Sequence, residues 1–140
     1  MEIFNLPENL GQMQGLRVVT INNAPKLSTL PASLTILTSL EHLMVSDCES
    51  FSSLPEDGFG NLASLITLTL KNLPRLLKLP MAVSRLASLH VLNVQKCDRL
   101  SELPEGLESA RSLREVHLER CSNLKDLPEA LLARAGRIQV

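Results

Sequence analysis

Residues 89–107 read LHVLNVQKCDRLSELPEGL, and this arrangement of apolar residues recurs along the chain. Counted from Leu89 as offset 0, further apolar residues stand at offsets 3, 5, 8, 11, 14 and 18. The Leu-Pro pair at offsets 14 and 15 recurs every 24 or 25 residues, at Leu6-Pro7, Leu30-Pro31, Leu54-Pro55, Leu79-Pro80, Leu103-Pro104 and Leu127-Pro128. Pairs that stay in phase over the whole chain indicate an internal structural repeat.

The repeat predicts a single domain over residues 1–140, built of five full units at 16–39, 40–64, 65–88, 89–112 and 113–136. Residues 1–15 fit a partial N-terminal repeat without a strand, and residues 137–140 fit a truncated sixth strand. We expect a short closing helix at 131–134. Because neither end is a convincing polar cap, we expect either a longer array or an end-to-end homo-oligomer.

The spacing within a unit predicts its shape. Offsets 3 and 5 alternate with polar residues, which is typical of a β-strand, and the later steps of three are typical of a 3₁₀ arc. One unit alone leaves its apolar row exposed, whereas stacked units bury the rows in a continuous core. The sequence therefore predicts an α/β solenoid with a parallel sheet. The segment from Glu56 to Asn61, which includes Phe59, carries one extra residue and is predicted to be an irregular loop.

Two stretches carry a narrower resemblance: Cys97-Asp-Arg-Leu100-Ser-Glu-Leu103-Pro104 and Cys121-Ser-Asn-Leu124-Lys-Asp-Leu127-Pro128. They resemble leucine-rich repeats, and in particular those of plant intracellular nucleotide-binding leucine-rich-repeat disease-resistance proteins. The resemblance implies a curved solenoid with the sheet on the concave face and short 3₁₀, helical or irregular arcs on the convex face. It also implies a recognition or regulatory role in immunity, with a pathogen effector or a nucleotide-binding signalling domain as partner. The alternative is a stand-alone scaffold or adaptor in intracellular signalling, with no immune role.

The chain departs from that family in two ways. It has no Gly-x-x-x-x-Gly-Lys-Ser/Thr loop, so we expect no nucleotide-binding domain in it. The first and third units also lack the Cys at offset 8 and have Pro25 and Pro74 one residue later. This difference predicts turns made without the usual side-chain bond, and therefore a slight difference in shape between odd and even units.

Composition restricts the partners. Aromatic residues make up only 2% of the chain and the formal net charge is −1, which argues against nucleic acid and against an anionic membrane. Three widely spaced Cys residues and the lack of a signal peptide at Met1 favour a reducing, cytoplasmic or nuclear compartment. We therefore expect a protein partner.

Catalytic and metal sites are not expected. His42, His90 and His117 stand at mismatched offsets, and the three Cys residues are expected to be buried at the turns. A cysteine enzyme would need a reactive thiol with a low pKa. Cys97 and Cys121 are in adjacent units, so a disulfide between them is sterically conceivable. The sequence predicts no enzyme, cofactor or metal.

Function is therefore assigned to the outward side of the sheet. We predict a partner-binding set formed by Val18, Thr20, His42, Met44, Thr67, Thr69, Lys71, Val91, Asn93, Lys96, Glu115, His117 and Arg120. Within it, Val18, Met44 and Val91 are expected to form an apolar set. Lys71, Lys96 and Arg120 are expected to form a basic edge that suits an acidic partner. The lack of Trp and Tyr predicts weak or avidity-dependent binding.

Overall fold

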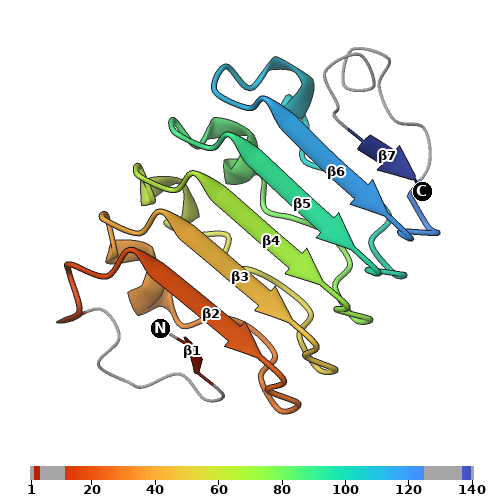
Figure 1. Cartoon of the computed structure of the whole chain (residues 1–140), viewed down its shortest axis with the longest axis horizontal. Coiled ribbons are helices and arrows are strands. Elements are labelled where there is room, and N and C mark those ends of the chain that lie inside the picture. The colour runs from red at the N-terminus through yellow and green to blue at the C-terminus, as the bar shows by residue number, and fades with distance from the viewer. Residues whose placement is uncertain (1, 4–11, 125–136, 140) are drawn as a thin grey trace.

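The computed structural model describes residues 2–3, 12–124 and 137–139. Its strands form one parallel sheet in the order of the sequence (Figure 1). They are β1 (Glu2–Ile3), β2 (Val18–Asn22), β3 (His42–Ser46), β4 (Thr67–Lys71), β5 (Val91–Gln95), β6 (Glu115–Glu119) and β7 (Arg137–Gln139). Because every strand pairs with its predecessor and its successor in the sequence, the chain advances by one strand per unit, as a solenoid does.

The register of the sheet follows the spacing of the repeat. From β2 to β6, residues 24 or 25 positions apart are cross-strand partners, so equal offsets line up in rows across these five strands. The row at offset 2 consists of Val18, His42, Thr67, Val91 and Glu115. The row at offset 3 consists of Val19, Leu43, Leu68, Leu92 and Val116. A residue is therefore placed on the sheet by its offset alone.

The core consists of the aliphatic rows. In β5, Leu92 and Val94 are fully buried, whereas Val91, Asn93 and Gln95 are partly exposed. This alternation of buried and partly exposed residues confirms the predicted strand periodicity. Each fully buried leucine contributes roughly 1.5–3 kcal/mol relative to an exposed one, so the stacked rows are the main source of stability.

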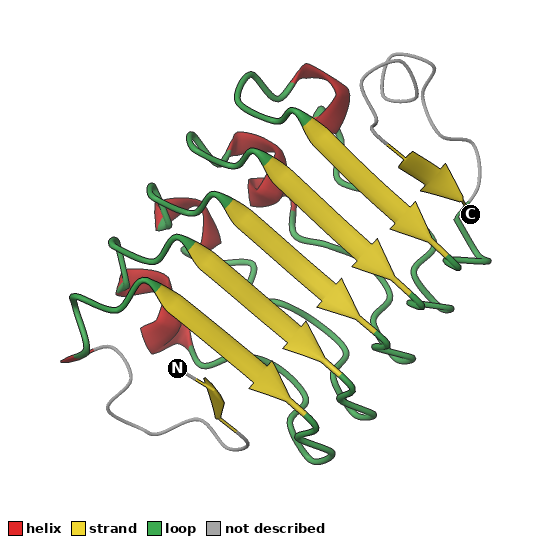
Figure 2. Cartoon of the chain, viewed as in Figure 1, coloured by secondary structure: helices red, strands yellow, loops and turns green. Residues whose placement is uncertain are grey.

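Among the described residues, four 3₁₀ helices form the other side of the solenoid (Figure 2). They are η2 (Ala32–Ile36), η3 (Phe59–Asn61), η4 (Met81–Arg85) and η5 (Leu107–Ser109), and each packs against the next. Phe59, predicted to lie in an irregular loop, begins η3 and is fully buried. The extra residue of the second unit is thus accommodated on the arc while Phe59 still fills a core position.

Odd and even units do differ in shape. At the turns the thiol of Cys48, Cys97 or Cys121 donates to a backbone carbonyl, a bond that Ala24 and Leu73 cannot make, as predicted. All five turns are nevertheless closed by the same backbone hydrogen bond, from the N–H at offset 11 to the carbonyl at offset 8, at 3.1–3.3 Å. The difference in shape lies in the arcs. The five-residue helices η2 and η4 follow Pro31 and Pro80, whose extended backbone leads into the helix. The three-residue helices η3 and η5 follow Gly58 and Gly106, both at φ 83°, where only glycine is free of strain.

The ends add one correction. The N-terminal segment was predicted to lack a strand, but β1 pairs with β2 through Glu2–Thr20 and Ile3–Ile21. At the other end β7 pairs with β6. The predicted closing helix at 131–134 lies outside the described residues, and the unit boundaries stay a prediction.

Candidate interaction surface

We call the side of the sheet that faces away from the core the open face. It carries the side chains at offsets 2, 4 and 6 of β2–β6. Among the predicted contact residues, Val18, His42, Lys96, Glu115 and Arg120 are exposed. Those that are partly exposed are Thr20, Met44, Thr67, Lys71, Val91, Asn93 and His117. The structure therefore brings nearly all of them to one accessible side.

Thr69 is the exception and corrects the prediction. Its side chain is only 7% exposed, although its offset directs it to the open face. Its cross-strand neighbours are Met44 and Asn93, both longer side chains. A short, β-branched residue between two longer ones is covered by them, so Thr69 offers almost no contact area to a partner.

The predicted apolar set is also not contiguous. Val18 and Val91 both stand in the row at offset 2, but His42 and Thr67 lie between them. Three strand spacings of about 4.8 Å place the two valines roughly 14 Å apart, and Met44 stands in the row at offset 4. The open face therefore carries separate apolar side chains in polar surroundings.

Side-chain hydrogen bonds order the polar part of the open face. Ser46 Oγ donates to Asn22 Oδ1 at 3.0 Å, across from β3 to β2, and Gln95 Nε2 donates to Asn93 Oδ1 at 3.1 Å along β5. His117 Nε2 lies 3.0 Å from Glu115 Oε2 on β6. These bonds restrict the rotamers of the face, which lowers the entropy cost of binding a partner.

The turns after β2–β6 each begin with a residue at offset 7 in the left-handed region. The values of φ are 59° at Asn23, 55° at Asp47, 50° at Asn72, 54° at Lys96 and 55° at Arg120. The N–H of the first four donates to the carbonyl at offset 6 of the next strand, at 2.8–3.1 Å. The ladder of the sheet thus extends one residue into each turn.

Lys96 and Arg120 stand out in this row. Asn and Asp tolerate the left-handed conformation, whereas other L-residues pay roughly 1–2 kcal/mol for it. Asn72 also gains a hydrogen bond from its Nδ2 to Asp47 Oδ1 at 2.8 Å. Within the part of the chain that the structure describes, no ion pair or side-chain hydrogen bond is made by Lys96 or Arg120. Sequence reasoning found both residues as charges and missed their backbone conformation.

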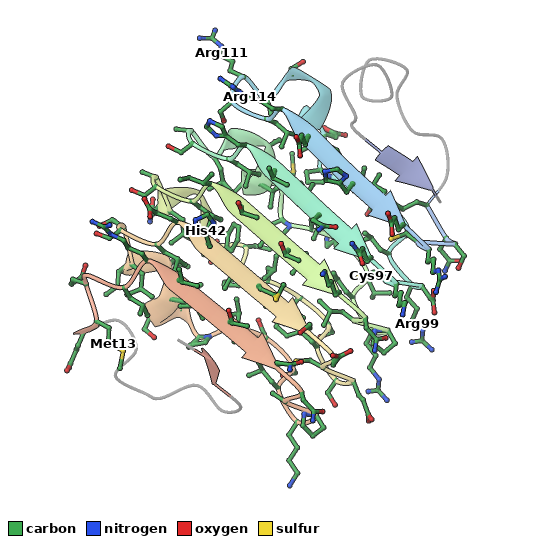
Figure 3. The ribbon with its side chains drawn as sticks, viewed as in Figure 1. Met13, His42, Cys97, Arg99, Arg111 and Arg114 are labelled. Atoms are coloured by element: carbon green, nitrogen blue, oxygen red, sulfur yellow. The ribbon has the colours of Figure 1, made fainter. Side chains whose placement is uncertain are left out.

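Cations gather at the same edge in the last three full units. We call Lys71, Arg75, Lys96, Arg99 and Arg120 the basic turn edge. Figure 3 shows Arg99 beyond the end of its strand, whereas Arg111 and Arg114 lie at the opposite edge, where strands begin. A hollow of about 300 Å³ opens beside the basic turn edge, and Met44, Lys71 and Lys96 are among its lining residues.

A second hollow of about 450 Å³ lies over the arcs, with Met81 in its wall. Its lining carries charges of both signs, and two of them already pair, Lys78 Nζ with Glu56 Oε1 at 3.7 Å. An exposed pair of this kind contributes little to stability. Unlike the basic turn edge, this hollow therefore has no excess of positive charge.

The three thiols lie inside the coil. Cys48, Cys97 and Cys121 are free and fully buried. Burial raises the pKa of all three, that of Cys97 to about 12. The Cys97 Sγ donates to the carbonyl of Gln95 at 3.4 Å. These thiols stay protonated near neutral pH and are shielded, which is the opposite of what a nucleophilic cysteine needs.

Two further findings concern only the described residues. No group of three or more His, Cys, Asp or Glu side chains there is placed to hold a metal ion. No helix there is long and apolar enough to cross a membrane.

Comparisons with known proteins identify the fold. The leucine-rich-repeat domain of the type III effector XopL matches with a TM-score of 0.65 and 19% identity, covering 91% of this chain and 60% of that one. A leucine-rich-repeat protein of Leptospira interrogans matches with a TM-score of 0.73 and 21% identity, covering 97% of this chain and 34% of that one. The fold is that of a leucine-rich-repeat solenoid.

The likeness is one of fold. This leucine-rich-repeat chain spans 60% and 34% of the length of those two structures. No family model and no curated protein matches the sequence. The narrower resemblance to plant disease-resistance proteins stays a prediction.

Proposed function

We propose that this chain is a non-catalytic protein-interaction module that binds its partner on the open face. The observation that carries the proposal is a contrast between offsets. Offsets 3 and 5 are aliphatic in every full unit, because the core demands it. Offset 2 runs through Val, His, Thr, Val and Glu in the five units, although the backbone is the same. The fold leaves these positions free to suit a partner.

The chemistry of the open face supports a protein partner. It combines separate apolar side chains, ordered amides and hydroxyls, and cations at one edge, which is the mixed character of a protein interface. Buried thiols with raised pKa values argue against cysteine catalysis. The low aromatic content argues against stacking on nucleic-acid bases.

The finer proposal is that the module serves plant-type immunity, with a pathogen effector or a nucleotide-binding signalling domain as partner, in the cytoplasm or the nucleus. Its support is the Cys-x-x-Leu-x-x-Leu-Pro pattern of the fourth and fifth units. The alternative is a stand-alone scaffold or adaptor in signalling. The likeness to leucine-rich-repeat domains of other kinds of protein fits this alternative as well as it fits the immune role. If affinity capture with this chain recovers a nucleotide-binding protein, the immune role is favoured. If the specific partners include no such protein, the scaffold is favoured.

The test compares two matched variants in affinity capture with mass spectrometry. Met44→Asp places a charge on the partly exposed centre of the open face. Met81→Asp makes the same change at a side chain that is 52% exposed on the arcs. We expect specific partners to be lost with Met44→Asp and kept with Met81→Asp, with both variants folded by circular dichroism. Partners that survive Met44→Asp and are lost with Met81→Asp would overturn the proposal.

A further inference from the structure

The basic turn edge concentrates positive charge that the chain as a whole lacks. The turn segments 71–75, 95–99 and 119–123 carry five cations and only the carboxylates of Asp98 and Glu119. The equivalent segments 22–26 and 46–50 carry Lys26 against Asp47 and Glu49. The formal charge of the whole chain is −1. The positive field is therefore local and belongs to the last three full units.

The backbone gives an independent reason to assign this edge a function. Lys96 and Arg120 hold the left-handed conformation, at φ 54° and 55°, in a row where Asn23, Asp47 and Asn72 show the residues that suit it. Strain kept at a surface position, where no core contact requires that side chain, points to a role outside folding. Both side chains are exposed, and neither makes an ion pair or side-chain hydrogen bond among the described residues.

Resting on the proposed function, we infer that the basic turn edge binds an extended acidic segment of the partner protein, with its carboxylates on Lys71, Lys96 and Arg120. Lys96 and Arg120 share offset 7 on adjacent units, about 4.8 Å apart at the backbone. Lys71 stands at offset 6 of the preceding unit and pairs with Gln95, the residue before Lys96. Acidic side chains on one side of an extended segment recur every two residues, about 7 Å apart. The long, flexible stems of Lys and Arg bridge that difference.

The neighbouring groups favour a protein segment over a nucleic acid. Glu119 and Asp98 interrupt the row of cations and would repel a continuous line of phosphates. The hollow beside the edge carries Met44, an apolar contact for a side chain between the carboxylates. Gln95 and Asn72 also line the hollow, and each amide keeps one N–H beyond the bond it already donates to Asn93 or Asp47. The carboxylate of Asp47 lies in the same lining and also disfavours phosphates. A segment of alternating acidic and apolar residues matches this surface.

The experiment uses a fluorescein-labelled peptide of alternating Glu and Leu, read by fluorescence anisotropy at low and physiological salt. We expect binding by the unmodified chain that weakens as salt rises. The double variant Lys96→Asn/Arg120→Asn should bind at least about tenfold more weakly, because two charged contacts are removed. The matched control Arg111→Asn/Arg114→Asn removes the same charge at the opposite edge of the sheet and should bind within about twofold of the unmodified chain.

The midpoint of thermal unfolding separates the backbone strain from the loss of charge, because Asn and Gln variants remove the same charges. Lys96→Asn/Arg120→Asn should raise the midpoint by several degrees, because Asn suits the left-handed backbone. Lys96→Gln/Arg120→Gln should weaken peptide binding equally without that rise. If neither midpoint rises, the strain that motivates the assignment is absent and the inference is overturned.

Other outcomes also decide. Equal weakening in the Arg111/Arg114 control, or tighter binding of a 20-base-pair DNA duplex than of the peptide, would overturn the inference. No peptide binding, together with partner capture that is lost with Met44→Asp, would overturn this inference and leave the proposed function standing. Peptide binding as expected, with partner capture insensitive to Met44→Asp, would overturn the proposed function instead.

Discussion

Truncating a leucine in the middle of the core tests whether the stacked rows hold this solenoid together. Leu92 is fully buried in β5, and its cross-strand neighbours are Leu68 and Val116. Leu→Ala at such a site removes the buried methyl groups and leaves a cavity, at a cost of about 2–5 kcal/mol. Units on both sides hold the cavity walls in place, so we expect a cost near the middle of that range, about 3–4 kcal/mol, rather than at its lower end.

The contrast is with Leu16, which is only partly buried and packs against the core at the first full unit. Part of its side chain already meets solvent, so we expect Leu16→Ala to cost about 1 kcal/mol. A chain of this length has a stability of about 7–15 kcal/mol, so both variants should fold.

Urea unfolding followed by far-ultraviolet circular dichroism measures both variants. For a slope of about 1.5–2 kcal/mol per molar urea, Leu92→Ala should lower the midpoint by about 2 M. Leu16→Ala should lower it by about 0.5 M, with the slope unchanged in both. Equal losses at the two sites, or a loss below about 1 kcal/mol at Leu92, would refute the picture of a core held from both sides.

Three further predictions concern the turns and the thiols. Gly58→Ala should cost about 2–3 kcal/mol in thermal unfolding, because φ is 83° and a Cβ there would stand 3.0 Å from a threonine hydroxyl. Gly106→Ala has the same φ, but its Cβ would stand 3.9 Å from a serine hydroxyl, which is an ordinary contact, so it should cost about 1 kcal/mol. Gly60→Ala should be nearly neutral, and any other ranking of the three variants contradicts this reading. Because burial raises the pKa of Cys97 to about 12, the unfolded chain loses that proton first as pH rises from about 9. Unfolding free energy should therefore fall between pH 9 and 12, by up to about 1.4 kcal/mol per pH unit for this thiol, and Cys97→Ala should flatten that fall in urea titrations. Asn72→Ala should cost about 1–2 kcal/mol, since it loses the bond to an aspartate and keeps φ at 50°, and Asn72→Gly should cost less; equal losses would assign the whole effect to the bond.

The part of the fold that depends on periodicity could be predicted from the sequence. Leu92 and Val94 alternate with polar neighbours, and the step of 24 or 25 residues sets the register, so strands and core rows follow from spacing. The strand β1 was missed because it is out of phase with the repeat: Glu2 and Ile3 pair with residues 18 positions later, not 24 or 25. The absence of a side-chain bond in the turns that contain Pro25 and Pro74 was predictable, whereas the backbone hydrogen bond shared by all five turns was not.

The candidate site was less predictable, because accessibility depends on neighbours distant in sequence. Thr69 has the offset of a surface residue, but the lengths of Met44 and Asn93 on the adjacent strands cover it. The conformation at Lys96 was hidden for a different reason. Asn and Asp, the usual residues of a left-handed turn, occupy offset 7 in the first three units. They indicate the same conformation at Lys96 only when all units are compared at that offset.

The backbone strain at Lys96 and Arg120 is a substantial fraction of the free energy of unfolding that such a chain has. At roughly 1–2 kcal/mol each, Lys96 and Arg120 together cost about as much as one buried leucine contributes. Asn would fit the same backbone, as Asn23 and Asn72 show. The cost falls on two of the five cations of the basic turn edge, and it leaves the aliphatic rows beneath untouched, since Cys97 and Cys121 on the next residues remain fully buried. A repeat fold can bear this local loss because its stability is spread over many equivalent core positions, so charge can be placed at one edge independently of the core.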